Sequence, residues 1–188
     1  MKNKIINLIE KSILTKEKLI ALNLYDIEKI VKLCIKSLRH GGKVIFCGNG
    51  GSAADSQHLA TELVVRFKKN RKSLSAIALT TNTSALTAIG NDFGFDAIFS
   101  RQLEALANKK DILVAITTSG KSKNIVEVIK KAKQLGVQSI LFTGAKGKAL
   151  AKKCTAAIVV PEKDTALIQE AHICVGHILC ELIEEEIF

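Results

Sequence analysis

Residues 43–63 read KVIFCGNGGSAADSQHLATEL and change character twice within this short stretch. The apolar run Lys43–Cys47 is typical of a buried strand, and the glycine-rich loop GNGGS at 48–52 follows it directly. A helical pattern then begins near residue 53. A strand that passes through a glycine-rich loop into a helix is the repeating unit of parallel α/β sheets, so this stretch predicts that class of fold.

The rest of the chain repeats the same alternation. Four further apolar runs are strand candidates: Ser75–Leu79, Ile112–Ile116, Val137–Phe142 and Ala156–Val160. The helical segments between and after them are about 53–67, 83–90 with 95–107, 123–135, 146–153 and Thr165 to the end. Strands that alternate with helices require right-handed crossovers. The pattern therefore predicts an α/β fold with a five-stranded parallel sheet covered by helices on both faces.

The first 40 residues follow a different pattern. Apolar residues recur at helical spacing in two groups, from Ile5 to Leu14 and from Ile27 to Leu38, and these groups predict two helices. Gly41 and Gly42 then form a strong helix stop. We therefore expect an N-terminal helical extension at 1–40 and a sheet-containing domain at 41–188.

The composition limits the partners and the compartment. Hydrophobic residues make up 47% of the 188 residues but aromatic residues only 4%, so the core must be aliphatic. The net charge is +10, but the basic residues are spread and no aromatic-plus-basic motif accompanies them, so we expect no nucleic-acid partner. Five cysteines without a CxxC pair fit a reducing cytosol better than a disulfide framework. Lysines run through the N-terminal region and no apolar run looks long enough for a membrane span, so we expect a cytoplasmic protein without a membrane partner.

Polar loops follow three of the predicted strands: GNGGS at 48–52, TTNTS at 80–84 and TTSGKS at 117–122. The carboxyl ends of parallel strands share one edge of the sheet, where ligands bind. TTSGKS leads into a helix at Lys123, and a helix N-terminus favours an anion. GNGGSA also satisfies G-x-G-x-x-A, but the acidic residue that holds the ribose of a dinucleotide is missing at 79–82. The loops together predict a phosphate site, with simple capping of the helix by Ser122 as the structural alternative.

Ionisable and polar side chains lie near these loops. His58 and Glu62 are four residues apart on one helix face, where they could bind a divalent metal or where His58 could orient Glu62 as a base. His177 lies in an apolar stretch of the last helix, where an unpartnered imidazole is costly, so it needs a metal, a carboxylate or a substrate oxygen. Asn91 and Asp92 fall in a break between helical stretches. They could simply form a turn, or they could be a pair of polar side chains that hydrogen-bonds a polyol.

Four segments together resemble the sugar isomerase (SIS) domain proteins, and more closely the phosphoheptose isomerases. They are CGNGGSAADSQHLATEL, IALTTNTSALTAIGNDFGFDAIFSRQLEAL, ITTSGKSKNI and TALIQEAHICVGHILCELIE. The resemblance covers nearly the whole chain. It implies a three-layer αβα sandwich of flavodoxin-like type, a homotetramer with active sites at subunit interfaces, and one zinc ion per subunit.

The resemblance also implies roles for particular residues. The expected ligands of the one zinc ion are His58, Glu62, Gln169 and His177. The residues expected to bind the phosphosugar are Asn49, Gly50, Gly51, Ser52, Glu62, Asn91, Asp92, Thr117, Thr118, Ser119, Ser122 and Gln169. Glu62 and His177 are expected to be the catalytic acid and base groups. The chain departs from the family at Val65, where glycine precedes the family's arginine, and at Lys121, where asparagine is common, without losing an expected ligand.

The implied activity converts D-sedoheptulose 7-phosphate to D-glycero-D-manno-heptose 7-phosphate, the first step of ADP- or GDP-heptose precursor synthesis. This aldose–ketose isomerisation moves a proton between C1 and C2 through an enediol(ate), with Glu62 as base and His177 as acid. The alternatives are another phosphosugar isomerase of this fold and a non-enzymatic tetrameric scaffold that binds the replication initiator. Gln169 and His177 are separated by about 12 Å along a straight helix. Either two subunits contribute to one site, or one of these two residues is not a metal ligand.

Overall fold

The five predicted strands form a single parallel sheet in the computed structural model, which describes residues 1–188. The strands are β1 (Val44–Gly48), β2 (Ala76–Ala78), β3 (Ile112–Thr117), β4 (Gln138–Gly144) and β5 (Ala156–Val160). Their order is β2-β1-β3-β4-β5, and every neighbouring pair is parallel. The strand order reverses between β1 and β3, and the carboxyl ends of these two strands are therefore the expected ligand position.

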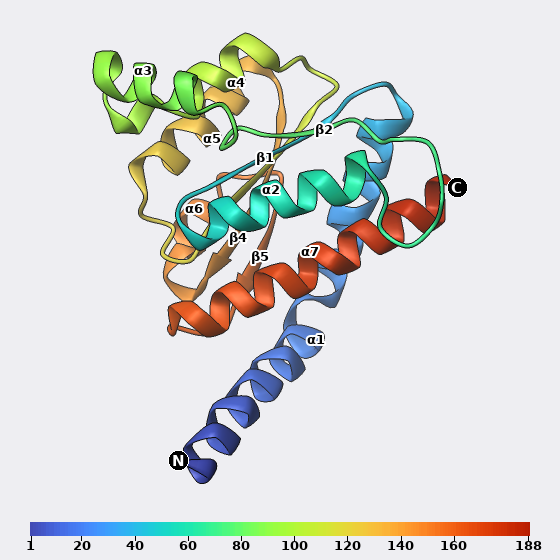
Figure 1. The fold of residues 1–188 in the computed structure, drawn as a ribbon, viewed down its shortest axis with the longest axis vertical. Coiled ribbons are helices and arrows are strands. Elements are labelled where there is room, and N and C mark those ends of the chain that lie inside the picture. The colour runs from blue at the N-terminus through green and yellow to red at the C-terminus, as the bar shows by residue number, and fades with distance from the viewer.

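Helices cover both faces of this sheet. They are α1 (Lys2–Arg39), α2 (Gly51–Val64), α3 (Thr83–Phe93), α4 (Ser100–Leu106), α5 (Lys123–Leu135), α6 (Lys148–Ala151) and α7 (Thr165–Ile187), with short 3-10 turns at Phe95–Ala97 and Ala145–Gly147. α1, α2 and α7 pack on one face, and α4, α5 and α6 pack on the other (Figure 1). The predicted three-layer αβα sandwich is confirmed.

The strands are apolar on both sides because both faces are covered. In β1, Val44 and Phe46 belong to the core cluster beneath α1, α2 and α7, whereas Ile45 and Cys47 belong to the cluster on the opposite face. All residues of β1 and β3 are buried. This two-sided burial explains why the strands appear in the sequence as continuous apolar runs.

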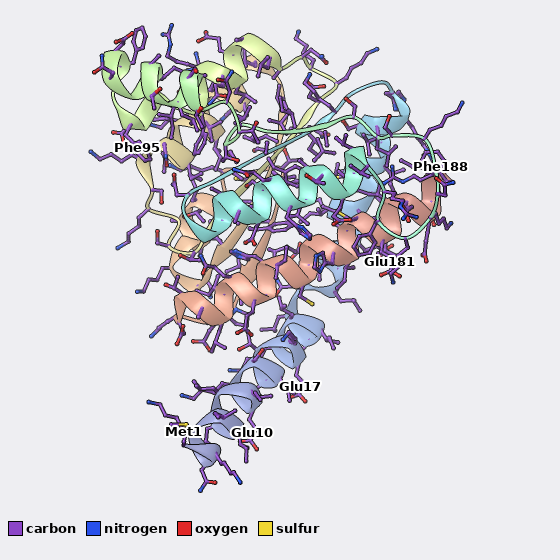
Figure 2. All side chains as sticks on the ribbon, in the orientation of Figure 1. Met1, Glu10, Glu17, Phe95, Glu181 and Phe188 are labelled. Atoms are coloured by element: carbon purple, nitrogen blue, oxygen red, sulfur yellow. The ribbon has the colours of Figure 1, made fainter.

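Residues 2–39 form one helix, α1, and the prediction of two helices is wrong. No glycine or proline interrupts the stretch between the two apolar groups, and Leu19 and Asn23 within it are buried. From about Leu19 onward α1 packs against β5 and α7, and its buried residues share one core with the sheet. The first turns project beyond the sheet, where Figure 2 labels Met1 and Glu10. The division of the chain at residue 40 stays a prediction.

Two helix boundaries also differ from the prediction. α2 ends at Val64 instead of continuing to residue 67, because the next residues bind α7 instead. α3 continues to Phe93, so Asn91 and Asp92 lie in its last turn rather than in a break between helices. Gly94, with φ 85°, ends the helix in a conformation that suits glycine.

α7 is long and apolar enough to cross a membrane by length and composition alone. The expectation that no apolar run reaches this length is therefore wrong. The inward side of α7 is nevertheless part of the protein core, where Ile168, Val175, Leu179 and Ile183 pack beside the sheet. The core helices of soluble proteins can have the same length and apolar composition.

Candidate active site

The loops after β1 and β3 lie side by side at the switch point of the sheet. The side-chain amides of Asn49 and Asn124 exchange two hydrogen bonds, each 2.9 Å long, and join the first loop to the start of α5. Asn124 is buried, with 2% of its surface exposed. The expected convergence of these loops is present in the structure. Asn124 was missed by the sequence analysis, although it lies only two residues beyond Ser122 in the TTSGKS loop.

The first loop turns directly into α2. Gly50 has φ 55°, which a side chain would strain, and its carbonyl accepts the N–H of Ala53 at 3.0 Å as the helix begins. The side-chain amide of Gln169 on α7 lies close to Gly51, since a Cβ placed on Gly51 would lie 2.6 Å from Gln169 Nε2, but Gly51 remains exposed. Ser52 is buried, and its N–H donates to the Asn49 carbonyl at 3.0 Å. Asn49, Gly50, Gly51 and Gln169 thus gather at the N-terminus of α2, while the Ser52 side chain points into the protein.

The second loop gathers hydroxyl groups at the N-terminus of α5. Thr117 Oγ1 lies 3.5 Å from Ser122 Oγ and accepts the Gly120 N–H at 3.3 Å. Ser119 Oγ accepts the Lys121 N–H at 3.2 Å. Ser122 is the N-cap residue of α5 but makes no side-chain capping hydrogen bond, so the simple capping alternative is not what the structure has. Thr118, Ser119 and Ser122 are partly exposed around a helix terminus, an arrangement that favours an anion.

The third loop, TTNTS at 80–84, leads from β2 into α3. Asn82 caps α3 by accepting the Ala85 N–H at 3.0 Å, and Gln57 of α2 donates to the Thr80 carbonyl at 3.3 Å. Asn91 and Asp92 bond to each other at 2.8 Å and remain exposed on α3, a helix without a buried residue. No hydrogen bond joins this pair to the other expected site residues of the same chain.

Two helices bring the expected acid and base groups together. His58 Nε2 on α2 lies 2.8 Å from His177 Nε2 on α7, and 3.6 Å from Glu62 Oε1. The two imidazole rings meet edge to face, with centroids 5.1 Å apart. α2 and α7 approach closely here because Gly176 has no side chain, since a Cβ there would lie 2.6 Å from a methyl group of Leu59. This close crossing positions the three ionisable side chains.

Two imidazoles and a carboxylate are ligands that zinc prefers in proteins. His58, Glu62 and His177 fit this chemistry, and their adjacent positions fit a shared ligand better than three independent surface groups. Gln169 does not join them within one chain, because it lies over Gly51 two turns earlier on the continuous helix α7. The single chain holds no group of three His, Cys, Asp or Glu side chains arranged around one point. Zinc binding therefore stays a prediction.

Asp55 is a further ionisable residue at this cluster that the sequence analysis missed. Its Oδ2 atom is buried without a hydrogen-bond partner. Burial raises the pKa of the Asp55 carboxyl, and the neighbouring charges of His58 and His177 partly oppose this effect. The spacing of Asp55, His58 and Glu62 at i, i+3 and i+7 places all three on one helix face and could have identified Asp55 from the sequence.

His172 lies in the core and is not part of this cluster. The ring is fully buried beside Phe142, with centroids 5.9 Å apart, and neither ring nitrogen has a hydrogen-bond partner. Burial lowers the pKa of His172 to about 4. The two late histidines of α7 therefore differ in environment, and only His177 reaches the candidate active site.

The chain is similar to known proteins over nearly its full length. The family model of the SIS domain matches residues 9–144. Phosphoheptose isomerase 1 of Campylobacter jejuni is 51% identical over 183 residues, which cover 96% of this chain and 98% of that protein. The solved structure of a phosphoheptose isomerase from Neisseria gonorrhoeae superposes with a TM-score of 0.92 at 39% identity and covers 98% of both chains. That of a phosphoheptose isomerase from Francisella tularensis superposes with a TM-score of 0.93 at 38% identity and covers 97% of both. The chain belongs to the SIS domain family and, within it, to the phosphoheptose isomerases.

Proposed function

We propose that the protein is an aldose–ketose isomerase that converts D-sedoheptulose 7-phosphate to D-glycero-D-manno-heptose 7-phosphate. The observation that carries this proposal is the presence of a hydroxyl-lined anion site at the N-terminus of α5, joined to the first loop through Asn49 and Asn124, and of a His58–Glu62–His177 cluster between α2 and α7. The chain is also about half identical to a phosphoheptose isomerase. The anion site suits the phosphate of the substrate, and the cluster suits proton transfer at the other end.

The reaction needs one proton to move between neighbouring carbons of the open-chain sugar. Glu62 removes a proton from C1, the C1–H electrons form a C1–C2 double bond, and the C2 carbonyl oxygen takes a proton from His177. The resulting enediol then receives a proton at C2 from Glu62 and gives the proton of its C1 hydroxyl to His177, which leaves the aldehyde and restores both side chains to their starting protonation states. The hydrogen bond between His177 and His58 holds the acid in place for these transfers.

The phosphate contributes binding energy far from the reacting carbons. In this proposal the hydroxyls of Thr117, Ser119 and Ser122 and the amides at the start of α5 hold the phosphate, because uncharged donors at a helix N-terminus bind an anion well. Asn49, Gly51 and Gln169 then contact the sugar chain. This binding fixes C1 and C2 near Glu62 and converts the proton transfer into a step within one complex.

We propose one zinc ion per subunit, held by His58, Glu62 and His177, with Gln169 as the fourth ligand of the family pattern. The donor types support this proposal, since imidazole and carboxylate ligands suit zinc. When bound, zinc supplies Lewis-acid polarisation of the sugar carbonyl. The distance of about 12 Å between Gln169 and His177 along α7 favours a site to which a second chain contributes.

We further propose a homotetramer with shared active sites. An apolar groove of about 910 Å³ lies between α1 and α7, lined by residues that include Leu19, Ile27, Val31, Val175, Ile178 and Leu182. The projecting half of α1 exposes a second apolar stripe, which includes Ile5, Ile9 and Ile13. Large exposed apolar patches of this kind favour association, and a dimer of dimers is the simplest closed form that repeats both contacts. α3, which buries none of its residues, can bring Asn91 and Asp92 to a neighbouring site.

The proposed cellular role is the first step of ADP- or GDP-heptose precursor synthesis in the cytoplasm, which serves lipopolysaccharide or capsule. Five free cysteines are compatible with a reducing compartment.

An assay of the purified protein tests the proposed function. Turnover of sedoheptulose 7-phosphate, with its loss after incubation with a chelator and recovery with zinc, supports both the reaction and the metal. Faster turnover of a pentose phosphate would instead favour another phosphosugar isomerase. Absence of turnover on every phosphosugar, together with binding to the replication initiator, would favour the scaffold.

A further inference from the structure

The loop that follows α2 is held to α7 by a buried ion pair. Arg71 Nε donates to Glu184 Oε2 at 2.7 Å, and each side chain is 2% exposed. The same carboxylate accepts three consecutive backbone N–H groups at 2.6–3.0 Å, those of Phe67, Lys68 and Lys69. Four donors therefore converge on Glu184, and the loop is held in one conformation against α7.

Arg71 also binds the end of α2. Its Nη2 donates to the Glu62 carbonyl at 2.9 Å, and its Nη1 donates to the Leu63 carbonyl at 2.9 Å. These carbonyls belong to the last turn of the helix, where no intrahelical N–H is left to satisfy them. A single guanidinium thus connects Glu184 on α7 to the backbone of the candidate base on α2.

The same loop reaches the candidate acid. The Phe67 ring lies beside the His177 ring, with centroids 5.7 Å apart and planes tilted by 30°. The Phe67 N–H is one of the donors to Glu184, so the carboxylate sets the position of this residue. Lys68 adds an ion pair with Glu181, which Figure 2 labels on α7 near the C-terminus.

We propose that Arg71 and Glu184 form a positioning pair that sets the spacing between Glu62 and His177 during isomerisation. This inference rests on the proposed function, because it assigns those two residues to proton transfer. A buried ion pair contributes little net stability compared with apolar residues of the same size. Arg71 binds the Glu62 carbonyl, and Glu184 holds Phe67 beside His177, so the pair is placed to fix the positions of both side chains. Proton transfer is sensitive to misplacement of its groups by about 1 Å, which can cost about a hundredfold in rate.

The test compares two variants with a matched control. Glu184→Gln places a side-chain amide N–H against the backbone N–H groups that now donate to the carboxylate. Arg71→Lys removes the guanidinium group that binds the Glu62 and Leu63 carbonyls. Asp111→Asn is the control, because Asp111 is also buried and accepts the backbone N–H and ammonium of Lys43 at 2.9 and 2.6 Å. Asp111 directly precedes β3, at the amino-terminal ends of the strands, whereas the candidate active site lies beyond their carboxyl ends.

For both test variants we expect kcat for sedoheptulose 7-phosphate to fall about ten- to a hundredfold, with KM within about threefold of the native value. Asp111→Asn should lower the melting temperature about as much as the two test variants do. It should leave kcat unchanged. Phe67→Leu is a third variant, to be used if neither test variant folds. Phe67 is only half-buried, so the protein should tolerate this change, and kcat should fall about threefold or more.

Unchanged kcat in folded Glu184→Gln protein or, if neither test variant folds, in Phe67→Leu protein would overturn the positioning role. A loss of kcat in Asp111→Asn equal to that in the test variants would also overturn it, because general destabilisation would then explain the effect. Failure of the proposed function has a different signature, since the native protein itself would then not turn over sedoheptulose 7-phosphate.

Discussion

His58 Nε2 and His177 Nε2 lie 2.8 Å apart, although 119 positions separate the two residues in the chain. The contact exists because α2 and α7 cross at Gly176, where a Cβ would meet Leu59 at 2.6 Å. Glu62 lies beside the pair, with Oε1 3.6 Å from His58 Nε2. The crossing of two helices thus assembles the candidate acid–base cluster, while the loops at the N-termini of α2 and α5 form the candidate phosphate site.

Replacement of Glu62 by glutamine tests the assignment of the base. The amide keeps the shape of the side chain but cannot accept the C1 proton, so turnover should fall by about two to four orders of magnitude. Steady-state kinetics on protein with a native circular dichroism spectrum measures the effect. Turnover within a few-fold of the native value would remove Glu62 from this role.

The double substitution of Ser119 and Ser122 by alanine tests the phosphate site. Loss of two hydroxyl donors at the N-terminus of α5 should raise KM for the phosphosugar by about a hundredfold or more, since each hydrogen bond to a charged group contributes about 1.5–3 kcal/mol. Calorimetry should also find the unphosphorylated sugar a poor ligand of the native protein. Equal affinity of the native protein for sugar and sugar phosphate would contradict the assignment.

Gly51→Ala tests the contact between the first loop and Gln169. The new Cβ would lie 2.6 Å from Gln169 Nε2, and the flexible amide can move away without disturbing the backbone. We expect stability to change by less than about 1 kcal/mol, while KM rises because Gln169 no longer lies close to the loop. Gly136→Ala is a useful comparison, because Gly136 has φ 71° at the end of α5. It should lose about 1 kcal/mol of stability without a change in KM.

Mixing two inactive variants tests whether active sites are shared between chains. Glu62→Gln and Gln169→Ala proteins should each have little activity alone, and dissociation and reassembly of a mixture should restore part of the activity, because some sites then combine an intact Glu62–His177 cluster of one chain with an intact Gln169 of another. The expected reason is that α7 separates Gln169 from His177 by about 12 Å, so that the full ligand set needs two chains. Hybrid tetramers, identified by mass spectrometry, that remain inactive would place the catalytic set within one subunit.

The stability of the protein at acid pH should depend on Glu184. Burial alone would raise the pKa of this carboxyl, but the N–H groups of Lys69, Phe67 and Lys68 and the Arg71 guanidinium together lower it from the ordinary 4.5 to about 2. The carboxylate therefore stabilises the fold above pH 4.5, and this contribution is lost as the pH falls from about 4.5 to about 2. A difference of this size corresponds to about 3 kcal/mol.

Urea unfolding of native and Glu184→Gln protein between pH 7 and pH 2.5 measures this contribution. The native protein should lose more stability than the variant over the acid range, because the variant has no carboxylate to protonate. Parallel curves for the two proteins would show that Glu184 does not contribute to the acid transition.

The strands and the two glycine- and hydroxyl-rich loops after β1 and β3 were predictable from the sequence because they depend on local features. Each strand of a doubly covered sheet is a continuous apolar run, as in Ile112–Ile116, and the loops after Cys47 and Ile116 carry the glycine and hydroxyl residues that their positions require. The i, i+4 spacing also placed His58 and Glu62 on one helix face.

Contacts between distant parts of the chain decided the rest. α1 continues as one helix through the stretch between the two apolar groups, where Leu19 and Asn23 are buried. α2 ends at Val64 because Arg71 binds its last carbonyls and Glu184 binds the N–H groups that follow, two interactions that no local pattern reveals. Hydrogen bonds and packing between residues more than a hundred positions apart depend on how the helices cross, so only the tertiary structure could place His177 against His58 and leave Gln169 over Gly51.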